Sequence, residues 1–120
     1  VLIEGSSTEE ATIAKVSEIL GASREVLVIL DSHHSHAHVL AELRLYSPLI
    51  GKGNFLVCGD TIIEYMPTET HRPRPWGPGN SPQTALREFL SETDRFAVDG
   101  DVDGKLLFTC NPGGYLRCVK

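Results

Sequence analysis

Two aspartates follow two of the buried strands that the sequence predicts. Asp31 comes directly after the apolar run of residues 25–30 (EVLVIL), and Asp60 comes two residues after the run 54–58 (NFLVC). Because parallel strands end at the same edge of a sheet, where open α/β sheets bind ligands, we expect the two carboxylates to lie close together. Carboxylate oxygens suit a hard cation such as Mg²⁺. The pattern predicts a divalent-metal site; the alternative is that each aspartate caps the segment after it.

Four of the five histidines lie within residues 31–38 (DSHHSHAH). A histidine close to Asp31, either His33 or His34, is a candidate general base or metal ligand. His34 and His38 are spaced i, i+4, which on a helix would place both on one face and can bind a transition metal. The cysteines lie far away in sequence, which disfavours structural zinc. The alternative is that these residues form the polar start of a helix, with the histidines exposed to water.

A proline-rich loop occupies residues 67–82 and contains the only tryptophan, Trp76. The loop follows the second of these strands, so we expect it to overhang the ligand edge. Arg74, Trp76 and Asn80 are the predicted substrate contacts, with the indole stacking on the substrate. The alternative is that the tryptophan only packs to hold the loop in place.

The elements that would position these residues alternate between strand and helix. Ser7 and Glu10 match an S-x-x-E capping box, and Ser81-Pro82 is typical of a helix start. This order predicts an α/β fold with a doubly wound, mostly parallel sheet and a C-terminal antiparallel hairpin. Strands are expected at residues 1–4, 25–30, 54–58, 96–98, 106–108 and 115–119, with a short extra strand at 61–64, and an Asp-Gly turn is expected within residues 99–104.

Composition restricts the class of protein further. The chain has 120 residues, 41% of them hydrophobic and 22% charged, which is typical of one globular domain rather than a disordered chain. A net charge of −5 without a basic cluster argues against nucleic acid as a partner. The longest apolar run is too short to span a membrane. Three cysteines without a CxxC motif indicate reduced thiols and a cytoplasmic protein.

Four segments together resemble the cephalosporin hydroxylase family. They are VLVILDSHHSHAHVLAELRLYSPLI, NFLVCGDTIIE, RPWGPGNSP and LLFTCNPGGYL, in the family's order and over nearly the whole chain. Members of this family resemble class I methyltransferases that use S-adenosylmethionine, with a divalent metal beside the methyl donor. The resemblance implies an O-methyltransferase acting on a small-molecule hydroxyl, in a setting such as antibiotic biosynthesis.

On the family's pattern, residues 1–120 correspond to the C-terminal part of a methyltransferase domain. The glycine-rich N-terminal strand and turn that would cradle S-adenosylmethionine have no counterpart here, so we expect the chain alone to bind neither that cofactor nor Mg²⁺ tightly. The resemblance assigns Asp31 and Asp60 as metal ligands, His34 and Asp31 as catalytic residues, and Asp31 also as a cofactor contact. Residues 5–7 (Gly5, Ser6 and Ser7) become adenine-side contacts. Gly59 departs from the family, whose members often have an acidic residue there.

Three functional hypotheses remain open from the sequence. The first is the metal-assisted O-methyltransferase. The second takes the family name literally: a non-haem iron hydroxylase would use Asp31, His34 and either His36 or His38. The third is a truncated domain without activity. The missing first and second strands would leave the edge of residues 25–30 open, which predicts a homodimer; the alternative is that residues 1–4 pair directly with residues 25–30.

Overall fold

Two apolar runs form a parallel pair of strands at one side of the sheet, and the C-terminal segment completes it. The computed structural model describes residues 1–23, 25–68 and 70–120. β1 (Val28–Leu30) pairs with β2 (Phe55–Cys58) in parallel, whereas β4 (Tyr115–Cys118) runs antiparallel to both β2 and β3 (Phe96–Val98). The strand order is β1-β2-β4-β3, so the last strand of the chain lies inside the sheet.

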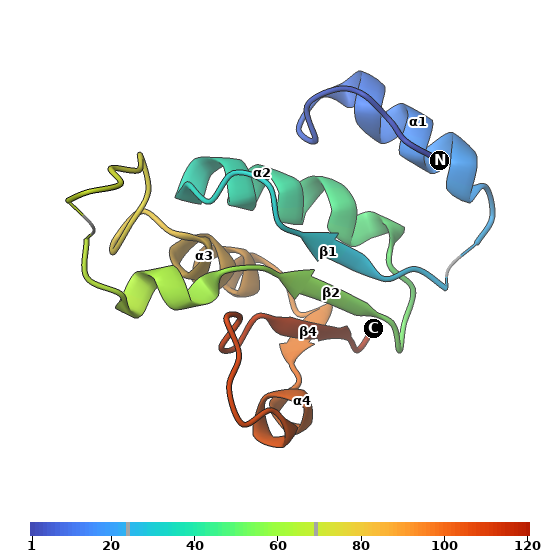
Figure 1. Cartoon of the computed structure of the whole chain (residues 1–120). Helices are drawn as coiled ribbons and strands as arrows, with labels where there is room; N and C mark the ends of the chain where they lie inside the picture. Colours follow the sequence, from blue (N-terminus) through green and yellow to red (C-terminus); the bar gives the residue numbers. More distant parts are fainter. Residues whose placement is uncertain (24, 69) are drawn as a thin grey trace.

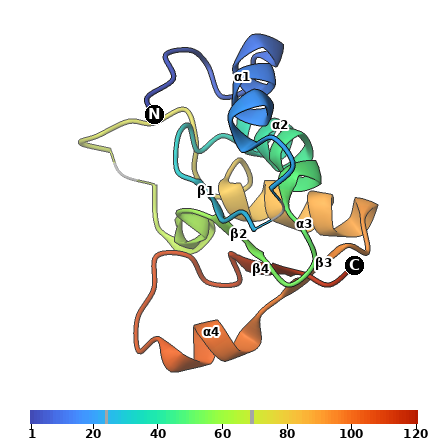
Figure 2. The same cartoon turned by 90° about the vertical axis from the view of Figure 1, so that its right-hand side faces the viewer.

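Two helices cover one face of this sheet. α2 (His36–Tyr46) and α3 (Pro82–Glu92) pack against each other and on the sheet, as Figure 1 and Figure 2 show. The core between them is apolar. It consists of Leu30, Val39, Leu40, Leu43, Ile50, Leu56, Cys58, Ala85, Leu86, Phe89, Phe96, Leu116 and Cys118.

The other elements lie outside this core. α1 (Glu10–Leu20) lies on the far side of α2 from the sheet, and the short α4 (Gly100–Lys105) lies beyond the opposite face, next to β4 (Figure 1). Two 3₁₀ helices, η1 (Ser47–Leu49) and η2 (Thr61–Tyr65), follow α2 and β2. Across the described residues no helix is long and apolar enough to cross a membrane.

The expected doubly wound, mostly parallel sheet is wrong. One of the three strand pairs is parallel and two are antiparallel. The strand–helix–strand alternation holds for β1, α2 and β2, but the C-terminal segment then places β4 between β2 and β3 instead of extending a parallel sheet. The expected C-terminal hairpin is an antiparallel pair whose strands are connected through α4 rather than by a tight turn.

Several local predictions are also corrected. Residues 1–4 and 106–108 are not strands: Val1, Leu2 and Leu107 are fully exposed. The Asp-Gly turn is α4, because Asp99 caps it by accepting from the backbone N–H groups of Asp101 and Val102.

The predicted extra strand at 61–64 is η2, and the capping box at the first helix does not form. The Ser7 hydroxyl bonds to His38 Nε2 instead, and α1 begins at Glu10.

Candidate metal centre

Asp31, His34 and Asp60 converge at the carboxyl ends of β1 and β2. Each contributes one potential ligand atom, and these atoms all lie within 4.8 Å of one another. His34 Nε2 is 3.4 Å from Asp60 Oδ2 and 4.0 Å from Asp31 Oδ1. The parallel pairing of β1 and β2 explains why the two aspartates lie close together. Leu30 and Cys58 are register partners, and each aspartate follows its strand within two residues.

Asp60 has a strained, left-handed backbone conformation, which sets the direction of its side chain. Asp60 has φ 53° and ψ 31°, and it is the only non-glycine residue with positive φ in the described part of the chain. Asn111 Oδ1 accepts a hydrogen bond of 2.8 Å from the Asp60 N–H and so holds this conformation. Left-handed residues outside glycine often mark functional sites. Asn111, which lies 51 positions later in the sequence, therefore orients a candidate metal ligand.

Gly59 leaves no room for a side chain between the two strand ends. A Cβ placed there would lie 2.6 Å from the carbonyl oxygen of Leu30 and 3.4 Å from Asp31 Oδ1. The Gly59 N–H donates to that same carbonyl at 2.8 Å. A side chain at this position would not fit this backbone, and the third donor near the two aspartates is the imidazole of His34.

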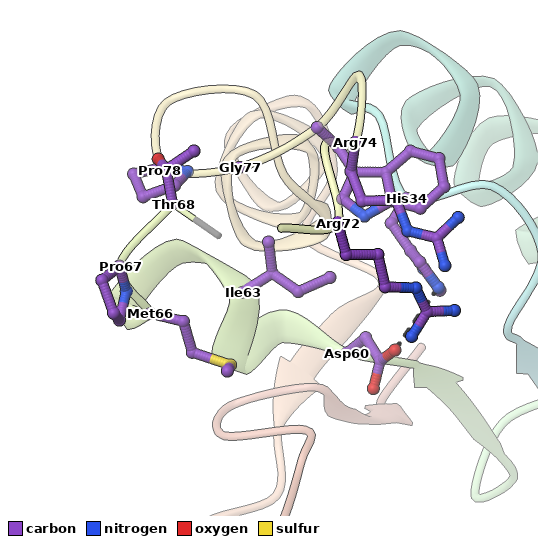
Figure 3. Close-up of a pocket in the computed structure, with 11 residues that line it drawn as sticks. His34, Asp60, Ile63, Met66, Pro67, Thr68, Arg72, Arg74, Gly77 and Pro78 are labelled. Carbon is purple, nitrogen blue, oxygen red and sulfur yellow. Dashed lines mark ion pairs between the residues drawn. The ribbon is translucent and has the colours of Figure 1, made fainter. Parts of the chain in front are cut away.

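A cavity of about 370 Å³ opens beside this cluster (Figure 3). Its wall contains His34 and Asp60 together with parts of η2 and of the proline-rich loop. Trp76 lies edge-on to His34 with ring centroids 5.2 Å apart, and edge-on to His33 at 4.8 Å. The indole thus lines the cavity and packs on the histidine segment, and its stacking on a substrate stays a prediction.

The predicted substrate residues differ in where they lie. Arg74 and Trp76 line the cavity, and the Arg74 guanidinium lies 5.3 Å from the centroid of the indole ring. Asn80 does not line it. Its Oδ1 accepts from the His36 N–H and its Nδ2 donates to the carbonyl oxygen of Pro75, so Asn80 fastens the loop to the start of α2.

Glu64, in η2, anchors this same end of the loop from the other side of the cavity. Its Oε2 accepts from the Ser81 hydroxyl at 2.6 Å and from the Gly79 N–H at 2.9 Å. These two hydrogen bonds stabilise the carboxylate and hold the pKa of Glu64 below its usual value. The loop is therefore fixed at both sides of the cavity.

His36 and His38 bond to groups outside the metal cluster. His36 Nε2 lies 3.1 Å from Glu88 Oε2, and His36 Nδ1 lies 2.8 Å from the Thr84 hydroxyl. His38 Nε2 bonds to the hydroxyls of Ser7 and Ser32. His34 precedes α2, so the i, i+4 pair does not share a helix face. Two histidines and one carboxylate, the ligand set of a non-haem iron oxygenase, do not come together within the described residues.

The loop predicted to contact adenine lies against α2. Ser7 Oγ is 3.2 Å from His38 Nε2, and the Tyr46 hydroxyl donates to the Ser7 carbonyl at 3.0 Å. Below them Glu42 is only 2% exposed and accepts from the Ser32 hydroxyl at 2.7 Å. Ser32 directly follows Asp31, so this polar network connects residues 5–7 to the same sheet edge as the metal cluster.

Comparison with known proteins identifies the family of the chain. A family profile described as rhamnosyl O-methyltransferase/CmcI matches residues 1–119. The chain belongs to this family. The rhamnosyl O-methyltransferases of Mycobacterium tuberculosis (strain ATCC 25618 / H37Rv) and Mycobacterium bovis (strain ATCC BAA-935 / AF2122/97) are each 31% identical to it over 118 residues. That of Mycobacterium leprae (strain TN) is 30% identical over 118 residues.

The matched region covers 97% of this chain but 46% of the M. tuberculosis and M. bovis relatives and 49% of the M. leprae relative. The chain thus spans about half the length of these members of the rhamnosyl O-methyltransferase/CmcI family. No solved structure matches it.

Sequence reasoning missed two contributors to the site. Asn111 belongs to the segment Asn111–Gly114, which the sequence marks only as a turn, and its contact with Asp60 is invisible without the fold. Arg72 lines the cavity as Arg74 does, and the signal available for it was its place two residues earlier in the same loop.

Proposed function

We propose that this chain forms the metal-binding and substrate-binding part of an O-methyltransferase acting on a small-molecule hydroxyl. The observation that carries this is the convergence of Asp31, His34 and Asp60 beside a cavity, in a chain of an O-methyltransferase family. Two carboxylates and one imidazole would neutralise and ligate a divalent ion such as Mg²⁺ or Mn²⁺. S-adenosylmethionine is the methyl donor that the family implies.

The residues of this chain have distinct parts in that reaction. Asp31, His34 and Asp60 would hold the cation, which supplies charge that acidifies a nearby substrate hydroxyl. Asn111 fixes Asp60, and Trp76 packs against His34, so the ligands are held before substrate arrives. If Asp31 and Asp60 alone held the cation, the free Nε2 of His34 would instead be placed to accept the hydroxyl proton. Residues 5–7 are linked to this sheet edge through the contacts of His38 with Ser7 and Ser32, and they are the proposed adenine-side contacts.

Metal binding tests the proposal directly. Mn²⁺ titrated into the chain should bind at one site by electron paramagnetic resonance. Asp60→Asn and Asp31→Asn should each weaken that binding by at least about tenfold, since loss of even an outer partner of a metal site commonly costs that much. Asp101→Asn, in α4 and outside the cluster, is the matched control. Equal Mn²⁺ binding by Asp60→Asn and the unchanged chain would refute the metal site.

We also propose that the chain is a cytoplasmic homodimer that pairs along β1. β1 is the edge strand of the sheet, and no other strand of the described chain pairs with its outer side. Leu27 and Ile29 are 61% and 64% exposed on this edge element. An apolar, unpaired edge strand is a template for pairing with a second chain.

An inactive domain is the competing proposal, because the relatives are about twice as long as the matched region. Failure of the chain to bind Mn²⁺ at Asp31, His34 and Asp60 would favour the inactive domain over the enzyme.

A further inference from the structure

Within the described residues, two positively charged side chains in the cavity have no ion pair with a carboxylate. Arg72 and Arg74 both line it, and none of the ion pairs in residues 1–23, 25–68 and 70–120 includes either guanidinium. By contrast, Arg44 on α2 is paired with Glu88 and Glu92. An arginine pair beside a ligand cavity is typical of oxyanion recognition, because the planar guanidinium binds carboxylate or phosphate through two parallel hydrogen bonds.

The charge balance of the site gives these arginines a role. Asp31 and Asp60 carry two negative charges, which a divalent cation would neutralise. The two guanidinium charges would then remain in a concave surface that concentrates their field on whatever enters. A neutral substrate would leave both guanidinium groups without an ion-pair partner, whereas a substrate with an oxyanion would supply that partner.

The two arginines also lie on the metal side of the cavity. Figure 3 shows both guanidinium groups on the side where His34 and Asp60 lie, with Met66 and Pro67 on the opposite, apolar side. Arg74 is held there by its contact with the Trp76 ring, and Trp76 in turn packs edge-on against His34. The oxyanion would therefore bind close to the hydroxyl that approaches the metal cluster.

We infer that the substrate carries an oxyanion, a carboxylate or a phosphate, close to its reacting hydroxyl, and that Arg72 and Arg74 bind this group. A uronic sugar has this arrangement, because its 4-hydroxyl is adjacent to the carbon that bears the carboxylate. The inference rests on the proposed function and specifies the substrate class of that same site.

The only tryptophan provides the readout, because Trp76 lies in the cavity. The probes are methyl glucuronide and methyl glucoside, which differ in the carboxylate alone, and inorganic phosphate. Titrations of the Mn²⁺-loaded chain follow Trp76 fluorescence, and saturation-transfer NMR of the sugar protons gives a second signal that does not depend on the indole. We expect glucuronide to bind at least about tenfold more tightly than glucoside, the effect of one charge-assisted hydrogen-bonded pair.

The Arg72→Gln/Arg74→Gln double variant should lose this preference. Lys15→Gln/Lys52→Gln removes the same charge from α1 and from the turn before β2, and should keep it. Circular dichroism checks that each variant is folded. Equal binding of the two sugars by the unchanged chain, or no response to either glucuronide or phosphate, overturns the inference.

Measurement of Mn²⁺ binding distinguishes failure of this inference from failure of the proposed function. If Mn²⁺ binds at Asp31, His34 and Asp60 but the sugars bind equally, the oxyanion subsite is wrong and the metal site stands. If the arginine-dependent preference for glucuronide persists in a chain that binds no Mn²⁺, the subsite stands and the metal-assisted reaction is wrong.

Discussion

Single side chains in this protein owe their chemistry to burial and to a few hydrogen bonds. Cys58 and Cys118 are buried in the core, whereas Cys110 is exposed. Burial raises the pKa of the Cys58 thiol to about 12, with a smaller contribution from the charge of Glu42. Since the thiolate is the reactive form, Cys58 should be inert in the folded protein.

One thiol of three should therefore react with a disulfide reagent under native conditions. We expect Cys110 to be labelled rapidly near pH 8, and Cys58 and Cys118 only after denaturation. Cys110→Ser should remove the fast reaction entirely, and counting the released thiolate measures it. Rapid labelling of two or three thiols in the native chain would show that the core is more open than the structure indicates.

The lowered pKa of Glu64 predicts a pH dependence with a definite sign. A carboxyl group whose folded pKa lies below its unfolded value, here about 4.5, adds stability at higher pH and loses it as the pH falls through the folded pKa. Glu64→Gln keeps the size of the side chain but cannot titrate. The thermal midpoint of the native chain should fall more steeply than that of Glu64→Gln as the pH is lowered below about 4.5. Parallel curves would contradict this.

The residues that could be predicted are those whose position follows from strand ends. Asp31 and Asp60 meet because parallel strands end together, and that needs only the pattern of apolar runs. The partners of Ser7 and Asp60 could not be predicted. The Ser7–His38 contact spans 31 positions and the Asp60–Asn111 contact spans 51, so both depend on how the elements pack.

Among the elements, α3 has the most strongly specified start. Ser81 accepts from the Thr84 N–H, Thr84 Oγ1 accepts from the Ser81 N–H, and Pro82 occupies the first helical position. This start was predictable from Ser81-Pro82 because all partners lie within four residues. The capping box at Ser7 and Glu10 failed because a distant histidine competes for the Ser7 hydroxyl.

Removing the α3 cap should destabilise the whole domain. Ser81 is fully buried and its hydroxyl also donates to Glu64. Ser81→Ala should lower the free energy of unfolding by about 1–2 kcal/mol, the usual cost of losing a cap. Ser91→Ala, at the exposed end of the same helix, should cost little. Chemical denaturation of the two variants measures the difference, and an equal loss in both would show that the cap is not special.

At the scale of the molecule, the family and the strand-to-helix alternation of its first half were predictable, and the sheet's final order was not. β1, β2, β3 and β4 all fall at predicted apolar runs. Their order depends on where the last strand inserts, a choice between non-local pairings that no local pattern encodes. Likewise, the expected strand at residues 106–108 has apolar residues but no partner among the described strands.

The open β1 edge gives a prediction for the assembled state. Light scattering at micromolar concentration should give twice the 13.1 kDa mass of the chain. A lysine at Ile29 leaves the buried face untouched but places charge beside the edge, a common way in which proteins block edge pairing. Ile29→Lys should shift the mass toward the monomer, whereas Val98→Lys, on β3 at the other edge, should not. A monomeric mass for the unchanged chain would refute the dimer.

The position of β4 also determines the order in which the protein can fold. Among the described strands β3 pairs only with β4, which follows it in the sequence. During synthesis, residues 96–98 must therefore wait without a strand partner until residues 115–118 have left the ribosome, and the sheet closes last at its centre. Cleavage between residues 98 and 115 would cost the sheet two strands, because β3 would have no partner among the described strands.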